Sequence, residues 1–224
     1  MGEAMKGRLP HSNALPIPIP TMAHNYLANH FTEAVLAEQE RYYGRRQTPP
    51  PSSGIDPLGE AEAGFIASRD SFYIASVTED GAPYLQHRGG PVGFLQVVGP
   101  NTLAFADLSG NRQLLTVGHL QRDNRVAMFL MDYPSRSRLK MDGRAAAIAA
   151  ADDPDLAARI APLGVPARMI ERIFLIEVTA FDWNCPKFIT PRFTAAEVDE
   201  VVAPLKARIA ELEAQIASNN TPET

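Results

Sequence analysis

The stretch FYIASVTEDGAPYLQHR (72–88) decides the fold class. Two strand-like segments, FYIASV (72–77) and PYLQHR (83–88), flank the short polar sequence TEDGA. The Asp80-Gly81 pair within it is a strong hairpin signal, because a tight turn between strands needs residues that tolerate a positive φ. The stretch therefore predicts an antiparallel β-hairpin.

Further strand-like segments follow this hairpin along the chain. Gly99-Pro100-Asn101 and Tyr133-Pro134-Ser135 mark two more turns, and helices are expected over 111–123 and about 153–161. Short strands at close spacing with a single helix between them indicate a closed or half-open barrel and not a βαβ arrangement. The additional strands are expected at GFLQVV (93–98), TLAFAD (102–107), RVAMFLMD (125–132), 137–149 and RIFLIEVTAF (172–181).

The regions on either side of the barrel differ in composition. Residues 1–22 hold four prolines and no sustained period, so we expect a flexible lead-in. The segment 23–58 is expected to hold one amphipathic helix, from about Asn25 to Tyr43 and ended by Gly44, followed by the Pro/Ser linker TPPPSSG. A short helix over 59–68 opens the barrel, which is expected to span 59–192.

The segment 193–224 is expected to form a helix and a short tail. Thr194 and Glu197 form a capping-box pattern, and apolar residues then recur at spacings of three and four. Pro204 should kink this helix or split it in two. Packing of its apolar face on the barrel and pairing with a partner are both open. The apolar residues are Val198, Val201, Leu205, Ile209, Leu212 and Ile216.

Composition excludes several broad classes of protein. The 224 residues carry a formal net charge of −5, which argues against general nucleic-acid binding, since that requires clustered cations. No apolar run approaches the roughly 18 residues of a membrane span. The single cysteine, Cys185, excludes an intrachain disulfide and fits a reducing compartment, so we expect a cytoplasmic protein with neither membrane nor nucleic acid as partner.

Common catalytic and metal-binding patterns are missing from the sequence. The Gly-Gly-Pro-Val-Gly run (89–93) departs from the dinucleotide fingerprint and lies in no βαβ unit. The five histidines are scattered, so no metal site is expected. Cys185 has no histidine placed near it, and no serine lies in a nucleophile elbow. No catalytic residue is therefore named.

Anion binding is the chemistry that the remaining residues favour. FADLSGNRQLL (105–115) runs from a strand into an expected helix start, where unpaired N–H groups attract anions and Arg112 could fork onto a phosphate. Arg88 ends a strand beside Gly89 and Gly90, which allow close approach to the backbone. A helix cap with a solvated arginine is the alternative interpretation of 105–115.

These residues also carry a resemblance to a known family. The stretch from about 65 to 150 resembles the pyridoxamine 5′-phosphate oxidase-like flavoproteins, in which an arginine opens a strand after the first hairpin, as Arg88 does in QHRGGPVGFLQV. A later family strand ends in Phe-Tyr-Thr and leads to a Ser-Arg-Lys loop, and FADLSGNRQ matches this spacing. The resemblance places Asp107 at the threonine, Asn111 at the serine, Arg112 at the arginine and Gln113 at the lysine.

Two further segments match in the expected order. SRLKMDG (137–143) looks like the family's Arg-Gln-Val-x-x-x-Gly segment, placing Arg138 at the flavin-contacting glutamine and Gly143 at the glycine. FDWNCPKFITPR (181–192) looks like the C-terminal motif of an uncharacterised subgroup. The resemblance implies a mainly β, six-stranded split barrel that binds FMN at a homodimer interface. The implied cofactor-binding residues are Arg88, Gly89, Gly90, Asp107, Asn111, Arg112, Gln113 and Arg138.

Departures from the family pattern limit what it implies. Gly93 and Gln113 stand where the family has phosphate-binding lysines, and 184–187 read Asn-Cys-Pro-Lys where true oxidases carry an Arg-Leu-His motif for the substrate's phosphate. We therefore expect an FMN-dependent oxidoreductase acting on an unidentified small molecule, not pyridoxamine phosphate. A non-catalytic or sensory flavin-binding protein, and the same barrel holding haem or a deazaflavin, are the alternatives.

Overall fold

The computed structural model describes residues 24–49, 51–52, 54–110, 112–183 and 186–219. The chain divides into two compact units. The first comprises Met1–Met131 and Arg138–Cys185, and the second comprises Asp132–Ser137 and Pro186–Thr224. The first unit contains the sheet and the candidate site.

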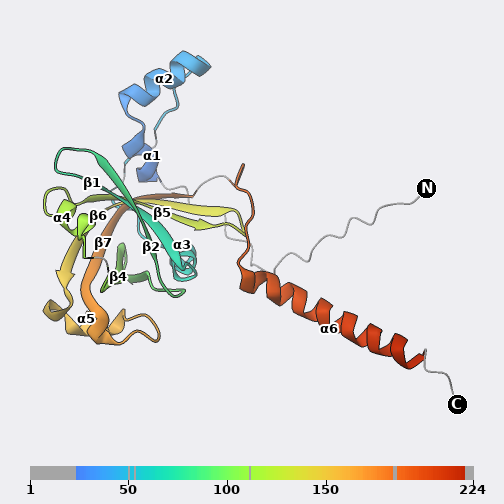
Figure 1. Ribbon diagram of the computed structural model, residues 1–224. Coiled ribbons are helices and arrows are strands. Elements are labelled where there is room, and N and C mark those ends of the chain that lie inside the picture. Colours follow the sequence, from blue (N-terminus) through green and yellow to red (C-terminus); the bar gives the residue numbers. More distant parts are fainter. Residues whose placement is uncertain (1–23, 50, 53, 111, 184–185, 220–224) are drawn as a thin grey trace. The chain divides into compact units, whose positions relative to one another are not determined.

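The sheet is antiparallel and runs in the order β2-β1-β5-β6-β7-β4-β3 (Figure 1). Each segment expected to be a strand contributes to it, although only the second half of 93–98 is in a strand, and the fold is the mainly β split barrel that was predicted, with flanking helices. It has seven strands instead of the six that the resemblance implied, because the short β3 pairs with β4. The strands are β1 Ser71–Val77, β2 Pro83–Gly89, β3 Gln96–Gly99, β4 Thr102–Leu108, β5 Arg125–Asp132, β6 Ser137–Ala149 and β7 Ile170–Trp183.

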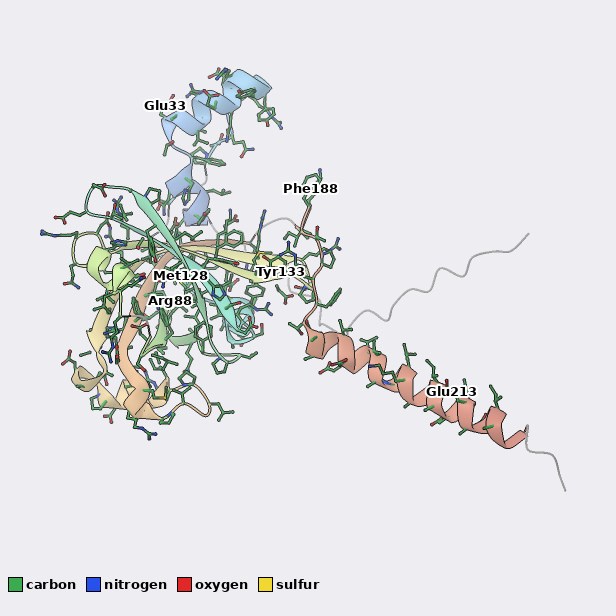
Figure 2. The ribbon with its side chains drawn as sticks, viewed as in Figure 1. Glu33, Arg88, Met128, Tyr133, Phe188 and Glu213 are labelled. Carbon is green, nitrogen blue, oxygen red and sulfur yellow. The ribbon has the colours of Figure 1, made fainter. Side chains whose placement is uncertain are left out.

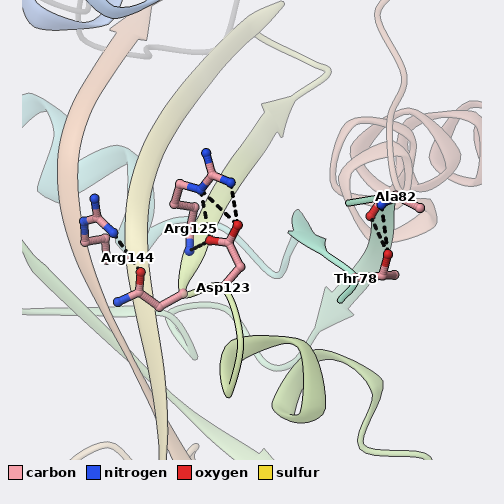
Figure 3. Close-up of polar contacts among 6 residues, drawn as sticks. Thr78, Ala82, Asp123, Arg125 and Arg144 are labelled. Carbon is pink, nitrogen blue, oxygen red and sulfur yellow. Dashed lines mark hydrogen bonds and ion pairs between the residues drawn. The ribbon is translucent and has the colours of Figure 1, made fainter. Parts of the chain in front are cut away.

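The first hairpin forms as the sequence predicts. Strand β1 pairs with β2 from Ser71↔Gly89 to Val77↔Pro83. Gly81 has φ +87°, a conformation that favours glycine, and Thr78 closes the turn by accepting at its hydroxyl from the Ala82 N–H at 2.9 Å (Figure 3). The Asp-Gly pair therefore sets the register of β1 and β2.

Stacked aromatic rings form the part of the core that lies under the site. Phe105 and Phe174 are directly paired across β4 and β7, and their ring centroids lie 4.8 Å apart with the planes 6° from parallel. Phe72 meets Phe105 edge-on at 5.4 Å. All three rings are fully buried, so this face of the sheet provides a rigid floor for the side chains above it.

The N-terminal segment forms two helices where one was predicted. Helix α1 spans His24–His30 and α2 spans Glu33–Tyr43. The Thr32 hydroxyl accepts from the Val35 N–H at 3.4 Å and starts a new helix, which is why the periodic pattern is interrupted there. Gly44 ends α2 at φ +65°, as expected for a glycine C-cap.

Helix α3, Glu60–Ala67, covers the start of the barrel and is tied to its last strand. The buried Glu62 carboxylate accepts from the Gly59 N–H at 3.0 Å and from the Trp183 indole N–H at 2.6 Å. Trp183 also packs edge-on against Phe65, with ring centroids 4.8 Å apart. The tryptophan of the FDWNCP stretch therefore has a structural role in the part of the chain that is described.

The helix expected over 111–123 is much shorter. Helix α4 spans Leu115–Leu120 and its N-cap is Leu114, at φ +55°. Residues 112–114 form a loop, so the prediction of one helix over 111–123 is wrong at its start, and residue 111 itself lies outside the described residues. Helix α5, Pro154–Arg159, forms where predicted, with the Asp153 carboxylate accepting from the Leu156 N–H at 2.9 Å. Two short 3₁₀ helices span Ala150–Asp152 and Ala167–Met169.

The second unit contains helix α6, Ala195–Asn219. The predicted capping box is present, since the Thr194 hydroxyl accepts from the Glu197 N–H at 3.2 Å and the Glu197 carboxylate accepts from the Thr194 N–H at 2.7 Å. Pro204 lies inside the continuous helix α6, so of the two expected outcomes the split into two helices is wrong, and a kink stays a prediction. No helix among the described residues is long and apolar enough to cross a membrane.

Candidate functional site

A cavity of about 230 Å³ lies where β2, β4 and β7 meet the loop before α4. It brings together residues that are far apart in the sequence, including Arg88 of β2, which Figure 2 labels. We call it the arginine cavity, because three guanidinium groups line it. Its lining residues are Gln86, Arg88, Asp107, Leu108, Gly110, Arg112, Gln113, Leu114, Leu115, Thr116, Val117 and Arg172.

Asp107 connects two of these arginines. One of its carboxylate oxygens, Oδ1, accepts from Arg88 Nη1 at 3.0 Å, and the other, Oδ2, accepts from Arg172 Nε at 2.8 Å. The side chain of Asp107 is 11% exposed, and those of Arg88 and Arg172 are 20% exposed. Two guanidinium groups thus share one largely buried carboxylate, which fixes their positions on the sheet.

Arg88 lies over the aromatic floor of the sheet. Its guanidinium carbon is 5.7 Å from the centroid of Phe105 and 5.1 Å from that of Phe174, within the range of cation–π contacts. Its Nε is buried and finds no hydrogen-bond partner in the described parts of the chain. Because buried donors are nearly always satisfied, this orphaned N–H suggests an acceptor from outside the chain.

Arg172 is a residue of the cavity that the sequence did not single out. It is the cross-strand neighbour of Asp107, and its Nη2 donates to Glu171 Oε2 at 2.7 Å. Burial lowers the pKa of Arg172, but the hydrogen bonds to Asp107 and Glu171 raise it above its usual value. Arg172 therefore stays cationic in the cavity. Its place at the start of the last predicted strand gave no signal, because only the β4–β7 register brings it to Asp107.

The loop between β4 and α4 carries the third arginine. Arg112 is exposed and has φ +59°, and Leu114 has φ +55°. Two non-glycine residues in the left-handed region, two positions apart, are unusual, and such strain clusters at ligand sites. Gln113 lines the same cavity, whereas Asn111 lies outside the described residues. Leu115, Thr116 and Val117 also line the cavity, so an anion here would meet both this loop and the first turn of α4, a helix that begins later than the sequence indicated.

Polar groups other than arginine complete the cavity wall. The Thr116 hydroxyl donates to Gln86 Oε1 at 2.8 Å, joining α4 to β2. This bond orients the Gln86 amide through its oxygen. The NH₂ group of the same amide is a hydrogen-bond donor. The wall thus combines cationic and neutral donors with a single carboxylate, a set suited to a small anion.

Gly89 and Gly90 line a neighbouring hollow of about 240 Å³, which shares Arg88, Asp107 and Leu108 with the arginine cavity. A Cβ on Gly90 would lie 2.7 Å from the Phe94 ring, so the missing side chain makes room for a core aromatic. Gly93 has φ +82°, where any other residue would be strained. That conformation favours glycine at this position.

Arg138, like Gly89 and Gly90, is an expected site residue that does not line the arginine cavity. It lies on β6 with its guanidinium 5.8 Å from the centroid of Phe129, and it is absent from the cavity's lining. Its Nε is also buried without a hydrogen-bond partner among the described residues. Gly143, matched to the family glycine, allows β7 to approach, since a Cβ there would lie 2.7 Å from the Glu177 carbonyl oxygen.

A larger hollow of about 880 Å³ lies elsewhere in the first unit, between α1 and strands β1, β5 and β6. Arg125 and Arg144 line it, held by Asp123 and by the Asn124 amide oxygen respectively (Figure 3). Hydrogen bonds from Arg125 lower the pKa of Asp123 to about 2. No group of three or more His, Cys, Asp or Glu side chains among the described residues is placed to hold a metal ion.

Residues 58–181 match the model of the family described as pyridoxamine 5′-phosphate oxidase. The chain belongs to that family. The match covers the stretch from about 65 to 150 on which the resemblance rested and the whole arginine cavity, so the predicted family is confirmed; the C-terminal motif at 181–192 lies almost entirely outside the match. It is a flavin-binding family. No curated protein matches the chain.

Solved structures with similar folds include three from bacteria. A conserved hypothetical protein from Mycobacterium tuberculosis is 18% identical, with a TM-score of 0.45, covering 64% of this chain and 95% of that one. General stress protein 26 from Bacillus anthracis str. Sterne is 12% identical, with a TM-score of 0.41 and coverage of 58% and 92%. An FMN-binding protein from Syntrophomonas wolfei subsp. wolfei is 9% identical, with a TM-score of 0.37 and coverage of 54% and 81%.

Proposed function

We propose that the protein is a cytoplasmic, homodimeric FMN-dependent oxidoreductase that binds the flavin phosphate in the arginine cavity. The observation that carries the proposal is the convergence of Arg88, Arg112 and Gln113 on one cavity. They come from two separate segments, strand β2 and the loop before α4, and each matches a phosphate-binding position of the family. Arg88 and Arg112 alone would be two unrelated surface cations if the fold did not bring them together.

The residues present fit a phosphate group. Among the described residues, the buried Nε–H of Arg88 has no hydrogen-bond partner and Arg112 forms no ion pair, so both keep donors for an incoming anion. Arginine forks match the oxygen geometry of phosphate and hold it more firmly than neutral donors do. The side-chain amides of Gln86 and Gln113 line the same cavity, and amide NH₂ groups can donate to the remaining phosphate oxygens.

The arginine cavity is large enough for the phosphate end of FMN but not for the whole cofactor. A volume of about 230 Å³ is below the roughly 300–1,000 Å³ of pockets that enclose a whole ligand of drug size. The ring system of a flavin would therefore lie outside the arginine cavity, beside the neighbouring hollow at Gly89 and Gly90. A second copy of the chain covering that ring is the arrangement that the family resemblance implies, and we propose it here.

The chain's own contribution is binding, orientation and shielding. A bound flavin supplies the redox chemistry by accepting and donating a hydride equivalent. Arg138 is proposed to lie near the ring system, where a cation favours the anionic reduced flavin. Because residues 184–187 lack the Arg-Leu-His motif, we propose a substrate other than pyridoxamine phosphate.

The absorption spectrum of the freshly purified protein tests the cofactor. Bands of an oxidised flavin, released on denaturation as FMN, are expected. A haem Soret band or a deazaflavin spectrum would contradict the cofactor assignment. Reduction of the bound flavin by a nicotinamide donor, followed by reoxidation with oxygen, is expected for an oxidoreductase. A flavin that is never reduced by any donor tried would instead favour a non-catalytic role.

A further inference from the structure

We infer that the Asp107–Arg172 pair sets how strongly this site prefers a phosphorylated flavin to the same flavin without its phosphate. The inference rests on the proposed function, because it concerns the same cavity. It gives Asp107 and Arg172 a role that does not follow from the family pattern. The resemblance places a neutral threonine where this chain has Asp107, and it gives no role to Arg172.

The pair is built into the sheet and not into a mobile loop. Asp107 on β4 and Arg172 on β7 are direct cross-strand partners, and their side chains are joined at 2.8 Å. Both side chains line the arginine cavity, and both are at least four-fifths buried. Their charges therefore act at short range in a partly desolvated place, where screening by water and salt is weak.

Asp107 opposes the binding of a phosphate in two ways. Its carboxylate occupies donors on Arg88 and Arg172 that a phosphate could otherwise use. Its negative charge also lies inside the cavity wall, where it repels a phosphate monoester carrying a charge of about −1.5 to −2 at neutral pH. The cavity is consequently less cationic than its three arginines suggest.

Arg172 acts in the opposite direction. Its Nε donates to Asp107 and its Nη2 donates to Glu171, which does not line the cavity, while Arg172 itself lines the cavity together with Arg88 and Arg112. Arg172 is a third cation available to the phosphate, at a position to which the family resemblance gives no role. The positive charge of Arg172 partly offsets the absence of the family's lysines at Gly93 and Gln113.

The experiment compares the dissociation constants of FMN and riboflavin, measured by flavin fluorescence on the full-length protein. Riboflavin lacks the phosphate, so the ratio of its dissociation constant to that of FMN reports the phosphate contribution alone. Asp107→Asn and Asp107→Thr should raise this ratio at least about tenfold, because a like charge near the anion is removed. Arg172→Gln should lower it at least about tenfold, with riboflavin affinity unchanged within threefold.

Asp123→Asn is the matched control. It also replaces a carboxylate that is ion-paired with an arginine, Arg125, and so changes the net charge equally, but Asp123 does not line the arginine cavity. The ratio should stay within about threefold of the wild-type value. A similar rise in this variant would show a general charge effect and would overturn the inference.

Two results would contradict the role of the pair while leaving the proposed function intact. One is a ratio that stays the same or falls in both Asp107 variants, which would mean that Asp107 only orders the arginines. The other is an unchanged ratio in Arg172→Gln. Failure of the proposed function looks different, since the wild-type protein itself would then bind riboflavin as tightly as FMN. Thermal unfolding of each variant identifies any that does not fold. The Arg172 variant and the Asp107 variants test the inference independently of one another.

Discussion

Replacing Arg112 by alanine should separate ligand binding from folding more cleanly than any other change in the arginine cavity. Arg112 is exposed, lies in the loop before α4 and forms no ion pair with a described residue. Alanine at φ +59° is no more strained than arginine, so the backbone cost is the same before and after. The free energy of unfolding should therefore change by no more than about 0.5 kcal/mol.

The effect on FMN binding should be much larger than the effect on stability. A hydrogen bond to a charged group contributes about 1.5–3 kcal/mol. That corresponds to a loss of roughly 10- to 150-fold in FMN affinity. Riboflavin binding should stay within about threefold, because the lost contact is to the phosphate. Fluorescence titration with both ligands and urea denaturation of the apoprotein provide the two measurements.

Arg122→Ala is the matched control for Arg112→Ala. Arg122 is also an exposed arginine near α4, paired with Glu79 at 3.4 Å, and it does not line the arginine cavity. Its removal should leave both affinities unchanged. In addition, Arg88→Ala and Arg112→Ala should be non-additive in FMN affinity if they hold one anion. Equal weakening of FMN and riboflavin by Arg112→Ala, or no weakening of either, would refute the phosphate role of this loop.

Three further predictions concern other parts of the molecule. Trp183→Phe should lower the free energy of unfolding by about 1–3 kcal/mol in urea denaturation, since it leaves the buried Glu62 carboxylate without its indole donor, and an unchanged stability would count against this link. The stability difference between wild type and Asp123→Asn should be present above pH 4 and vanish as the pH falls towards 2, because Arg125 lowers the pKa of Asp123 from 3.8 to about 2; a difference that persists below pH 2 would contradict this. Sedimentation of the flavin-loaded protein should give a dimer, and a fully loaded monomer would exclude a shared flavin site.

The strands of this fold were predictable because their local signals are strong. The Asp80-Gly81 turn sets the first hairpin, and β5 and β6 have the limits that the sequence indicated. Errors arose where one side chain overrides a periodic pattern. Thr32 caps a new helix within an amphipathic run, and the left-handed backbone of Arg112 and Leu114 delays the start of α4 by four residues. Such local choices depend on the surrounding structure as much as on propensity.

The candidate site was predictable only in part. Arg88, Asp107, Arg112 and Gln113 could be aligned with a family pattern, and the fold brings them together in one cavity. Arg172 could not be found in this way. Its partnership with Asp107 depends on a register between strands that are 65 residues apart, and a shift of one residue would point the side chain to the opposite face.

A crystal structure of the protein with FMN bound tests the central claim most directly. The account predicts the phosphate in the arginine cavity, with its oxygens about 2.7–2.9 Å from guanidinium nitrogens of both Arg88 and Arg112, as in other charge-assisted hydrogen bonds. It also predicts a ring system outside that cavity, on the side of Gly89 and Gly90. A phosphate bound anywhere else, with Arg88 and Arg112 both facing solvent or protein groups alone, would contradict it.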